Sequence, residues 1–180
     1  MSPTYYEYSC KSKPTLGLYQ EQAVKAHEWY TRGIETSDPI EAFTNFWRGF
    51  NSLYATIGKG DERKKIQAFL QNSICEVGAL HLLSTHAGCI DYLLSEPVIN
   101  MRDNVKSTAP NITAFKAASN PLVKLKEVVM LIYQVRCNLE HGQKSPSRER
   151  DVLLCHYAAR IIAALIDMKL TNCANTTTTG

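Results

Sequence analysis

Apolar residues recur every three or four positions through most of this chain, and this spacing decides what the chain can fold into. Asp38 is suited to cap a helix, Pro39 fits a first helical position, and Glu41 is placed to return the cap. The segment that follows carries one apolar face, made of Ile40, Phe43, Phe46, Trp47, Phe50, Leu53, Tyr54 and Ile57. No segment of useful length alternates apolar and polar residues as a half-buried strand does. The sequence therefore predicts an all-α fold.

The same period places further helices and one interruption. A first helix is predicted over Leu16–Ile34, with Val24 and Ile34 among its inward residues. Between Pro97 and Pro121 the pattern weakens, which predicts a loop or a short irregular helix. A length of 180 residues suits one well-filled core. We therefore expect a polar N-terminal arm over 1–14, a single helical domain over 15–170 and a disordered Thr-rich tail over 171–180.

Several classes of protein are disfavoured by composition. The six cysteines include no C-x-x-C pair and no His at zinc-ligand spacing, so we expect neither a structural metal nor a cofactor. The N-terminus lacks the apolar core of a signal peptide, which favours a cytoplasmic protein with reduced thiols. The longest apolar run, Val152–Ile166, is shorter than the roughly 20 residues that a bilayer requires. We expect no membrane span.

The charges are unevenly distributed along the chain. The formal net charge is only +3, but residues 102–150 carry nine Lys and Arg against four Asp and Glu. A basic excess of this kind suits a polyanionic ligand. A solvated surface explains so small a bias equally well.

Arg136 and His141 are the candidate reactive pair. Arg136 continues a seam of apolar residues at spacings of three and four, made of Leu122, Leu125, Val129 and Ile132. A guanidinium there needs a ligand or a counterion. His141 lies about 7.5 Å further along an ideal helix and about 140° around it, so the pair shares no face of a straight helix. The two converge only if the helix ends at Gly142, or if a second copy of the chain completes the site.

A purely structural interpretation of this pair stays open. Arg136 is placed to pair with Glu140 one turn later, a contact worth about 0.2 to 0.5 kcal/mol. His141 is placed to cap the C-terminus of the helix. As a two-residue pattern, Arg followed by His five positions later has little specificity.

Two segments resemble a known family. Residues 135–144, VRCNLEHGQK, resemble the signature of HEPN domains, most closely the Apea-like branch, whose motif runs approximately VRNNLFHGGK. Residues 46–54, FWRGFNSLY, are similar to an early helix of the same branch. The resemblance covers these two stretches well and the intervening helices only in pattern.

The resemblance implies a HEPN-like bundle of four to five core helices plus short helices, which dimerises and cleaves RNA without a metal. Arg136 would stabilise charge on the scissile phosphate, His141 would move a proton, and Asn138 would support them. The expected product is a 2′,3′-cyclic phosphate. A toxin, defence or stress role and an antitoxin or other regulatory partner are implied in the same way. Outside the motif, three cations are candidates for RNA phosphates, although a solvated helix start explains them equally: Lys144, Arg148 and Arg150.

The chain departs from the family pattern at two positions. Cys137 stands where the family usually has Asn or another polar residue, and Gln143 stands where one branch carries a Tyr that is adenylylated. Regulation by adenylylation at that position is therefore not supported. The alternative is a catalytically inactive HEPN-like protein that binds RNA or a nucleotide, or only dimerises. A helical repeat adaptor is disfavoured because the helices are not self-similar.

Overall fold

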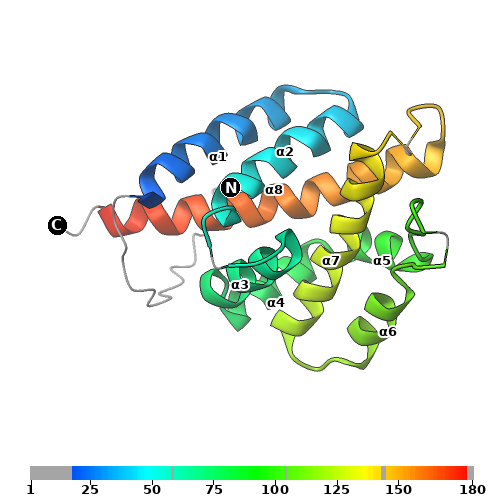
Figure 1. Cartoon of the computed structure of the whole chain (residues 1–180). Coiled ribbons are helices and arrows are strands. Elements are labelled where there is room, and N and C mark those ends of the chain that lie inside the picture. Colours follow the sequence, from blue (N-terminus) through cyan, green and yellow to red (C-terminus); the bar gives the residue numbers. More distant parts are fainter. Residues whose placement is uncertain (1–17, 58, 104, 143–144, 178–180) are drawn as a thin grey trace, which may run out of the picture.

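The computed structural model describes residues 18–57, 59–103, 105–142 and 145–177. These residues form helices joined by short connections, with one isolated antiparallel bridge between Ile99 and Ser107 (Figure 1). The all-α prediction is confirmed. None of the helices in these ranges is long and apolar enough to cross a membrane. The helices are α1 (Leu18–Glu35), α2 (Pro39–Tyr54), α3 (Glu62–Ser73), α4 (Glu76–Thr85), α5 (Ala87–Ser95), α6 (Ala109–Ala117), α7 (Pro121–Glu140) and α8 (Glu149–Thr177).

The core lies between a long-helix layer and a group of shorter helices. α1 and α2 form an antiparallel pair, and α2 packs along α8, the longest helix (Figure 1). α7 crosses beside this layer and contacts α3, α4 and α6 (Figure 1). Each of these helices contributes buried apolar side chains to one continuous core. The end of α7 is thereby held between α2, α3 and the segment that follows α5.

The start of α2 has the Asp38 cap and the Pro39 position that the sequence predicts. Asp38 accepts a hydrogen bond from the backbone N–H of Glu41 at 2.8 Å, and Pro39 occupies the first helical position. The apolar face of α2 is buried, and its rings meet edge to face, as Phe50 does with Phe69 at a centroid distance of 5.3 Å. α2 is therefore the central aromatic helix of the core.

The inward face of α1 differs from the prediction. Val24 and Ile34 are 54% and 62% exposed, whereas Ala26 is fully buried. The reason is the close approach of α1 to α2. A Cβ added to Gly33 would lie 2.5 Å from the Phe46 ring, so small residues, not large ones, form this contact. The prediction that Val24 and Ile34 face inward is wrong.

The segment between Pro97 and Pro121 is more regular than predicted. Residues 98–108, apart from the undescribed 104, form a tight turn whose ends are joined by hydrogen bonds between Val98 and Thr108. α6 then makes a regular helix with Pro110 in its first turn, and Pro121 opens α7. Both prolines mark helix starts because a helix needs no N–H from its first residues.

The ends of the predicted domain are only partly described. The 1–14 arm lies outside the described residues. α8 continues to Thr177, so a helix covers most of the 171–180 segment that was predicted as a tail.

Candidate functional site

The apolar seam of α7 ends in an arginine with two acidic neighbours. Val129 and Ile132 are fully buried, and Arg136 follows them with a side chain that is 26% exposed. Its Nη1 donates a hydrogen bond to Glu62 Oε2 at 3.0 Å, and its Nε lies 3.7 Å from Glu140 Oε1. The counterion that a seam arginine requires is therefore Glu62, which lies 74 residues away in the sequence at the start of α3.

Glu62 ties Arg136 into the aromatic core. Its other carboxylate oxygen accepts a hydrogen bond from Tyr54 Oη at 2.6 Å, and the Arg136 Cζ lies 6.0 Å from the centre of the Trp47 ring. Burial opposes the charge of Arg136, but the carboxylates of Glu62 and Glu140 outweigh burial and raise the pKa of Arg136. The guanidinium is thus held charged at the edge of the core. Its buried Nε has no hydrogen-bond partner, because 3.7 Å is too long for one.

Cys137 lies beside Tyr133 on α7. It is half-buried and one turn after Tyr133, whose pKa is raised by burial and by the Cys137 side chain. The Arg63 guanidinium of α3 lies 5.2 Å from the centre of the Tyr133 ring. Cys137 therefore contacts Tyr133, whose ring packs against Arg63 of α3.

His141 stands where α7 ends. Gly142 has a φ of 66°, in the left-handed region that favours glycine, and its N–H donates to the Leu139 carbonyl at 2.9 Å. The predicted helix end at Gly142 is confirmed. His141 is exposed, and its Nδ1 lies 3.0 Å from Nη2 of Arg102, in the 98–108 turn. Because a guanidinium only donates, Nδ1 is the acceptor, and a neutral His141 ring in this arrangement carries its proton on Nε2.

Arg136 and His141 face different neighbours. Within the part of the chain that the structure describes, no hydrogen bond or ion pair joins them: Arg136 contacts Glu62, and His141 contacts Arg102. Ending the helix at Gly142 therefore does not by itself bring the two side chains into contact. Of the structural interpretation, the Arg136–Glu140 pair is present at 3.7 Å, and His141 occupies the C-cap position of α7, although its side chain contacts Arg102.

Asn138 has a clear structural role beside this site. It is 2% exposed, its Nδ2 donates to the Ile99 carbonyl at 2.8 Å, and its Oδ1 accepts from Gln134 Nε2 at 2.9 Å and from the Met101 N–H at 3.4 Å. These bonds fasten the 98–108 turn to α7. Asn138 thereby supports His141 indirectly, through the turn that carries Arg102.

The three candidate phosphate-binding cations have different surroundings. Lys144 lies outside the described residues. Arg148 is exposed, and its Nε lies 4.0 Å from Asp151. Arg150 donates to the Glu96 carboxylate and, at 3.2 Å, to the Glu96 carbonyl, so it fastens the start of α8 to the end of α5. Of the two cations that are described, Arg148 is the more available to a ligand.

The two neighbours missed by sequence reasoning are Glu62 and Arg102. The start of α3 is visible in the sequence because Asp61 caps it, but nothing there pairs Glu62 with Arg136. Arg102 lies in the basic 102–150 region, and this charge excess is the only sequence signal that points to it as part of the site. Among the described residues, no group of His, Cys, Asp and Glu is arranged to hold a metal ion. No family model, curated protein or solved structure matches the chain.

Proposed function

We propose that this chain is a HEPN-type endoribonuclease that cleaves RNA without a metal at the C-terminal end of α7. The observation that carries the proposal is the pairing of an exposed imidazole, His141, with the guanidinium of Arg102, just beyond the charged Arg136. Guanidinium groups suit phosphate, and imidazole suits proton transfer near neutral pH. Once Arg102 turns from Nδ1 to the phosphate, the neutral His141 ring accepts the 2′-hydroxyl proton at Nδ1 as that oxygen attacks the phosphorus, and the imidazolium so formed gives its Nε2 proton to the leaving 5′-oxygen. The product is then a 2′,3′-cyclic phosphate.

A homodimer forms part of the proposal because Arg136 and His141 have separate neighbours within one chain. Across a two-fold axis, a second copy would bring the Arg136 and His141 side chains of both chains into one cleft. The 98–108 turn, which carries Arg102, also exposes large apolar side chains: Ile99 is 53%, Met101 38% and Val105 93% exposed. Exposed apolar residues gathered beside charged groups suit a protein interface.

Two arginines are assigned to the scissile phosphate in this proposal. Arg102 forms no ion pair within the described residues and directly contacts His141. Arg136 is bound to Glu62, but its Nε remains an unused donor. An RNA phosphate would therefore meet Arg102 first and engage Arg136 in competition with Glu62. Lys144 and Arg148 would contact flanking phosphates.

A second candidate is a catalytically inactive HEPN-like protein that binds RNA or a nucleotide, or uses the same surface only to dimerise. The observation that favours it is the neutralisation of Arg136 by Glu62 at 3.0 Å and by Glu140 at 3.7 Å. Cys137, which packs toward Tyr133, points the same way because it supplies no amide to a phosphate.

One assay separates the two candidates. Purified protein is incubated with mixed RNAs in excess chelator and compared with Arg136→Ala, His141→Ala and Arg102→Ala, with Arg160→Ala, on the exposed side of α8, as the matched control. The nuclease proposal predicts cleavage to 2′,3′-cyclic ends that the Arg136, His141 and Arg102 variants lose and the control keeps. If every protein leaves all RNAs intact while still binding them, the inactive candidate holds.

Oligomeric state and cellular role need separate tests. Sedimentation at micromolar concentration should show a dimer, and a strict monomer would exclude the composite site. A cytoplasmic toxin, defence or stress role, with an antitoxin or other regulatory partner, belongs to the same proposal. Induced expression should then slow growth, and the His141→Ala variant should not.

A further inference from the structure

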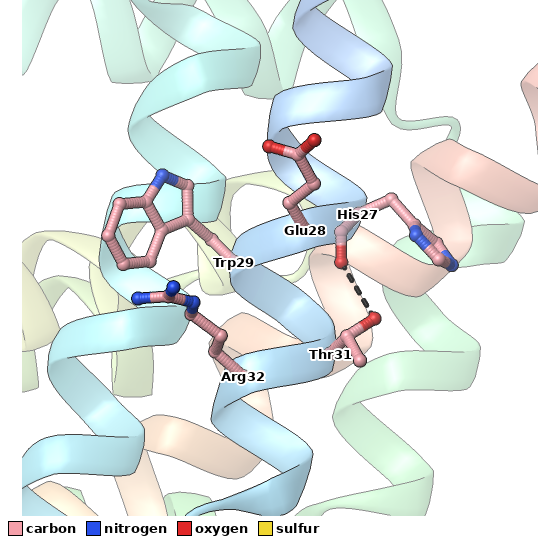
Figure 2. A pocket seen from close by; sticks show the side chains of 5 residues that line it. All are labelled: His27, Glu28, Trp29, Thr31 and Arg32. Carbon is pink, nitrogen blue, oxygen red and sulfur yellow. Dashed lines mark hydrogen bonds between the residues drawn. The ribbon is translucent and has the colours of Figure 1, made fainter.

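A tryptophan between two arginines lies where α1 packs on α2. Trp29 of α1 is half-buried, and its ring centre lies 5.4 Å from the Arg32 Cζ and 4.9 Å from the Arg48 Cζ of α2. Both distances are within the range of about 6 Å for cation–π contacts. Figure 2 shows Trp29 and Arg32 side by side on one side of α1, with His27 and Thr31 on the other. These residues and Glu28 line an open depression of about 730 Å³.

The ring is fixed in place by the packing of α1 on α2. Gly49, the residue after Arg48, lies so close to α1 that an added Cβ would be 3.3 Å from the Trp29 Cβ and 3.0 Å from the Ala26 carbonyl oxygen. The base of the Trp29 side chain is therefore held against the backbone of α2. The ring then holds one guanidinium from each helix, so both are oriented before any ligand arrives.

The two guanidinium groups have no acidic partner in the described ranges of the chain. Neither Arg32 nor Arg48 forms an ion pair among the residues that the structure describes, and Glu28, one turn before Arg32, forms none with it. On the same helix, Lys25 and Glu21 at the same spacing pair at 2.6 Å. The described part of the chain thus leaves two positive charges on one ring without a counterion. A phosphodiester would neutralise them, and planar guanidinium groups bind phosphate oxygens in pairs.

We propose that Trp29, Arg32 and Arg48 form a second RNA contact, in which the two arginines bind neighbouring backbone phosphates and the exposed edge of the Trp29 ring lies against a base. Aromatic rings interleaved with cations are the usual means of binding single strands without sequence preference. The choice of RNA as the ligand rests on the proposed function, whereas the charge and geometry of the contact do not. Trp47, the residue before Arg48, lies next to Arg136, so the two regions occupy adjacent sides of α2.

The site can be tested by tryptophan fluorescence because the chain has only two tryptophans and Trp47 is 3% exposed. A 2′-O-methylated RNA 12-mer is the probe, since it lacks the hydroxyl needed for cleavage and stays intact even if the protein is a nuclease. We expect saturable quenching that Trp29→Phe removes. Arg32→Gln combined with Arg48→Gln should raise the Kd about tenfold or more at low salt. It should also lower the slope of log K against log salt by about 1.4, for two lost phosphate contacts on a single strand.

Controls separate this contact from other causes. Arg160→Gln on α8 should leave the Kd and the salt slope unchanged, and thermal melts should show that every variant is folded. The proposal is overturned if the double arginine variant binds with the wild-type Kd and slope. It is also overturned if polyglutamate or inorganic phosphate, at matched total charge, quenches Trp29 as the oligonucleotide does. Quenching without any cleavage of unmodified RNA would refute the nuclease and keep this site. Cleavage of unmodified RNA without quenching would keep the nuclease and refute this site.

Discussion

Removing the Glu62 carboxylate is the sharpest test of how the candidate site is built. In the folded chain it accepts a hydrogen bond from Tyr54 at 2.6 Å and pairs with Arg136 at 3.0 Å. The Glu62 and Arg136 side chains are each 26% exposed. A Glu62→Ala substitution would leave Arg136 with Glu140 alone, at 3.7 Å and on a side chain that is 49% exposed. We therefore expect a clear loss of stability.

The size of this loss of stability depends on how far the Glu62–Arg136 pair is buried. At 3.0 Å the Coulomb energy of two unit charges is about 1.4 kcal/mol in bulk water and about 5.5 kcal/mol at an effective dielectric of 20. Exposed pairs contribute about 0 to 1 kcal/mol, whereas removing one partner of a buried pair costs about 3 to 5 kcal/mol. A pair that is one-quarter exposed lies between these limits, near about 2 kcal/mol. The lost hydrogen bond from Tyr54 to a charged acceptor adds about 1.5 kcal/mol.

Unfolding by urea and by heat, followed by circular dichroism, measures this loss. Glu62→Ala should lower the free energy of unfolding by about 3.5 kcal/mol and the Tm by about 7 to 14 °C for a domain of this size. Glu62→Gln should lose about half as much, because its amide oxygen still accepts the hydrogen bond from Tyr54. Glu140→Gln is the matched control, and we expect a change below about 0.5 kcal/mol because that pair is longer and more exposed.

A double-mutant cycle attributes the effect to the pair. Glu62→Gln combined with Arg136→Gln should show a coupling free energy of at least about 1 kcal/mol. If Glu62→Ala unfolds within about 0.5 kcal/mol of the wild type, or if the coupling is absent, the counterion role of Glu62 is refuted. The same variant informs the functional proposal. Glu62→Gln should strengthen RNA binding if Arg136 contacts phosphate, because the competing carboxylate is gone.

Three further substitutions probe the surroundings of the site and the core. Burial, with the charges of Arg160 and His81, lowers the pKa of His86, so stability that is present above about pH 6.5 is lost as the pH falls toward that lowered pKa. The Tm of His86→Gln should therefore fall less than the wild-type Tm between pH 7 and 5, and an equal fall would contradict this. Asn138→Ala removes three hydrogen bonds at a buried position, so we expect a cost of about 2 to 3 kcal/mol and faster amide exchange in the 98–108 turn, which unchanged exchange would disprove. Gly142→Ala forces a φ of 66° on an L-residue and should cost about 1 to 2 kcal/mol in urea unfolding, whereas a neutral result would mean that the helix end relaxes.

Local patterns account for the parts of the fold that the sequence predicts correctly. The cap at Asp38, the buried aromatic face of α2, the seam of α7 and its end at Gly142 all follow from contacts within about one turn of helix. Helix position and helix ends depend on residues three or four places apart, and a single sequence carries that information. The resemblance to HEPN domains also rests on local motifs, and it stays a prediction that the RNA assay tests.

Packing between distant segments decided the rest. Val24 and Ile34 have the spacing of core residues, yet they are exposed because Gly33 and Gly49 draw α1 and α2 together along a different face. Which face of a helix is buried depends on the shape of the partner helix, and the spacing of apolar residues in one helix carries no information about that shape.

The neighbours of the candidate reactive side chains were decided in the same way. The sequence alone established an arginine on the apolar seam of α7 and a histidine at its end. Only the tertiary structure assigned Glu62 to Arg136 and Arg102 to His141, across separations of 74 and 39 residues. The physical reason is that a charge at the edge of a core must find its counterion in space, and the fold determines which acidic group lies within reach.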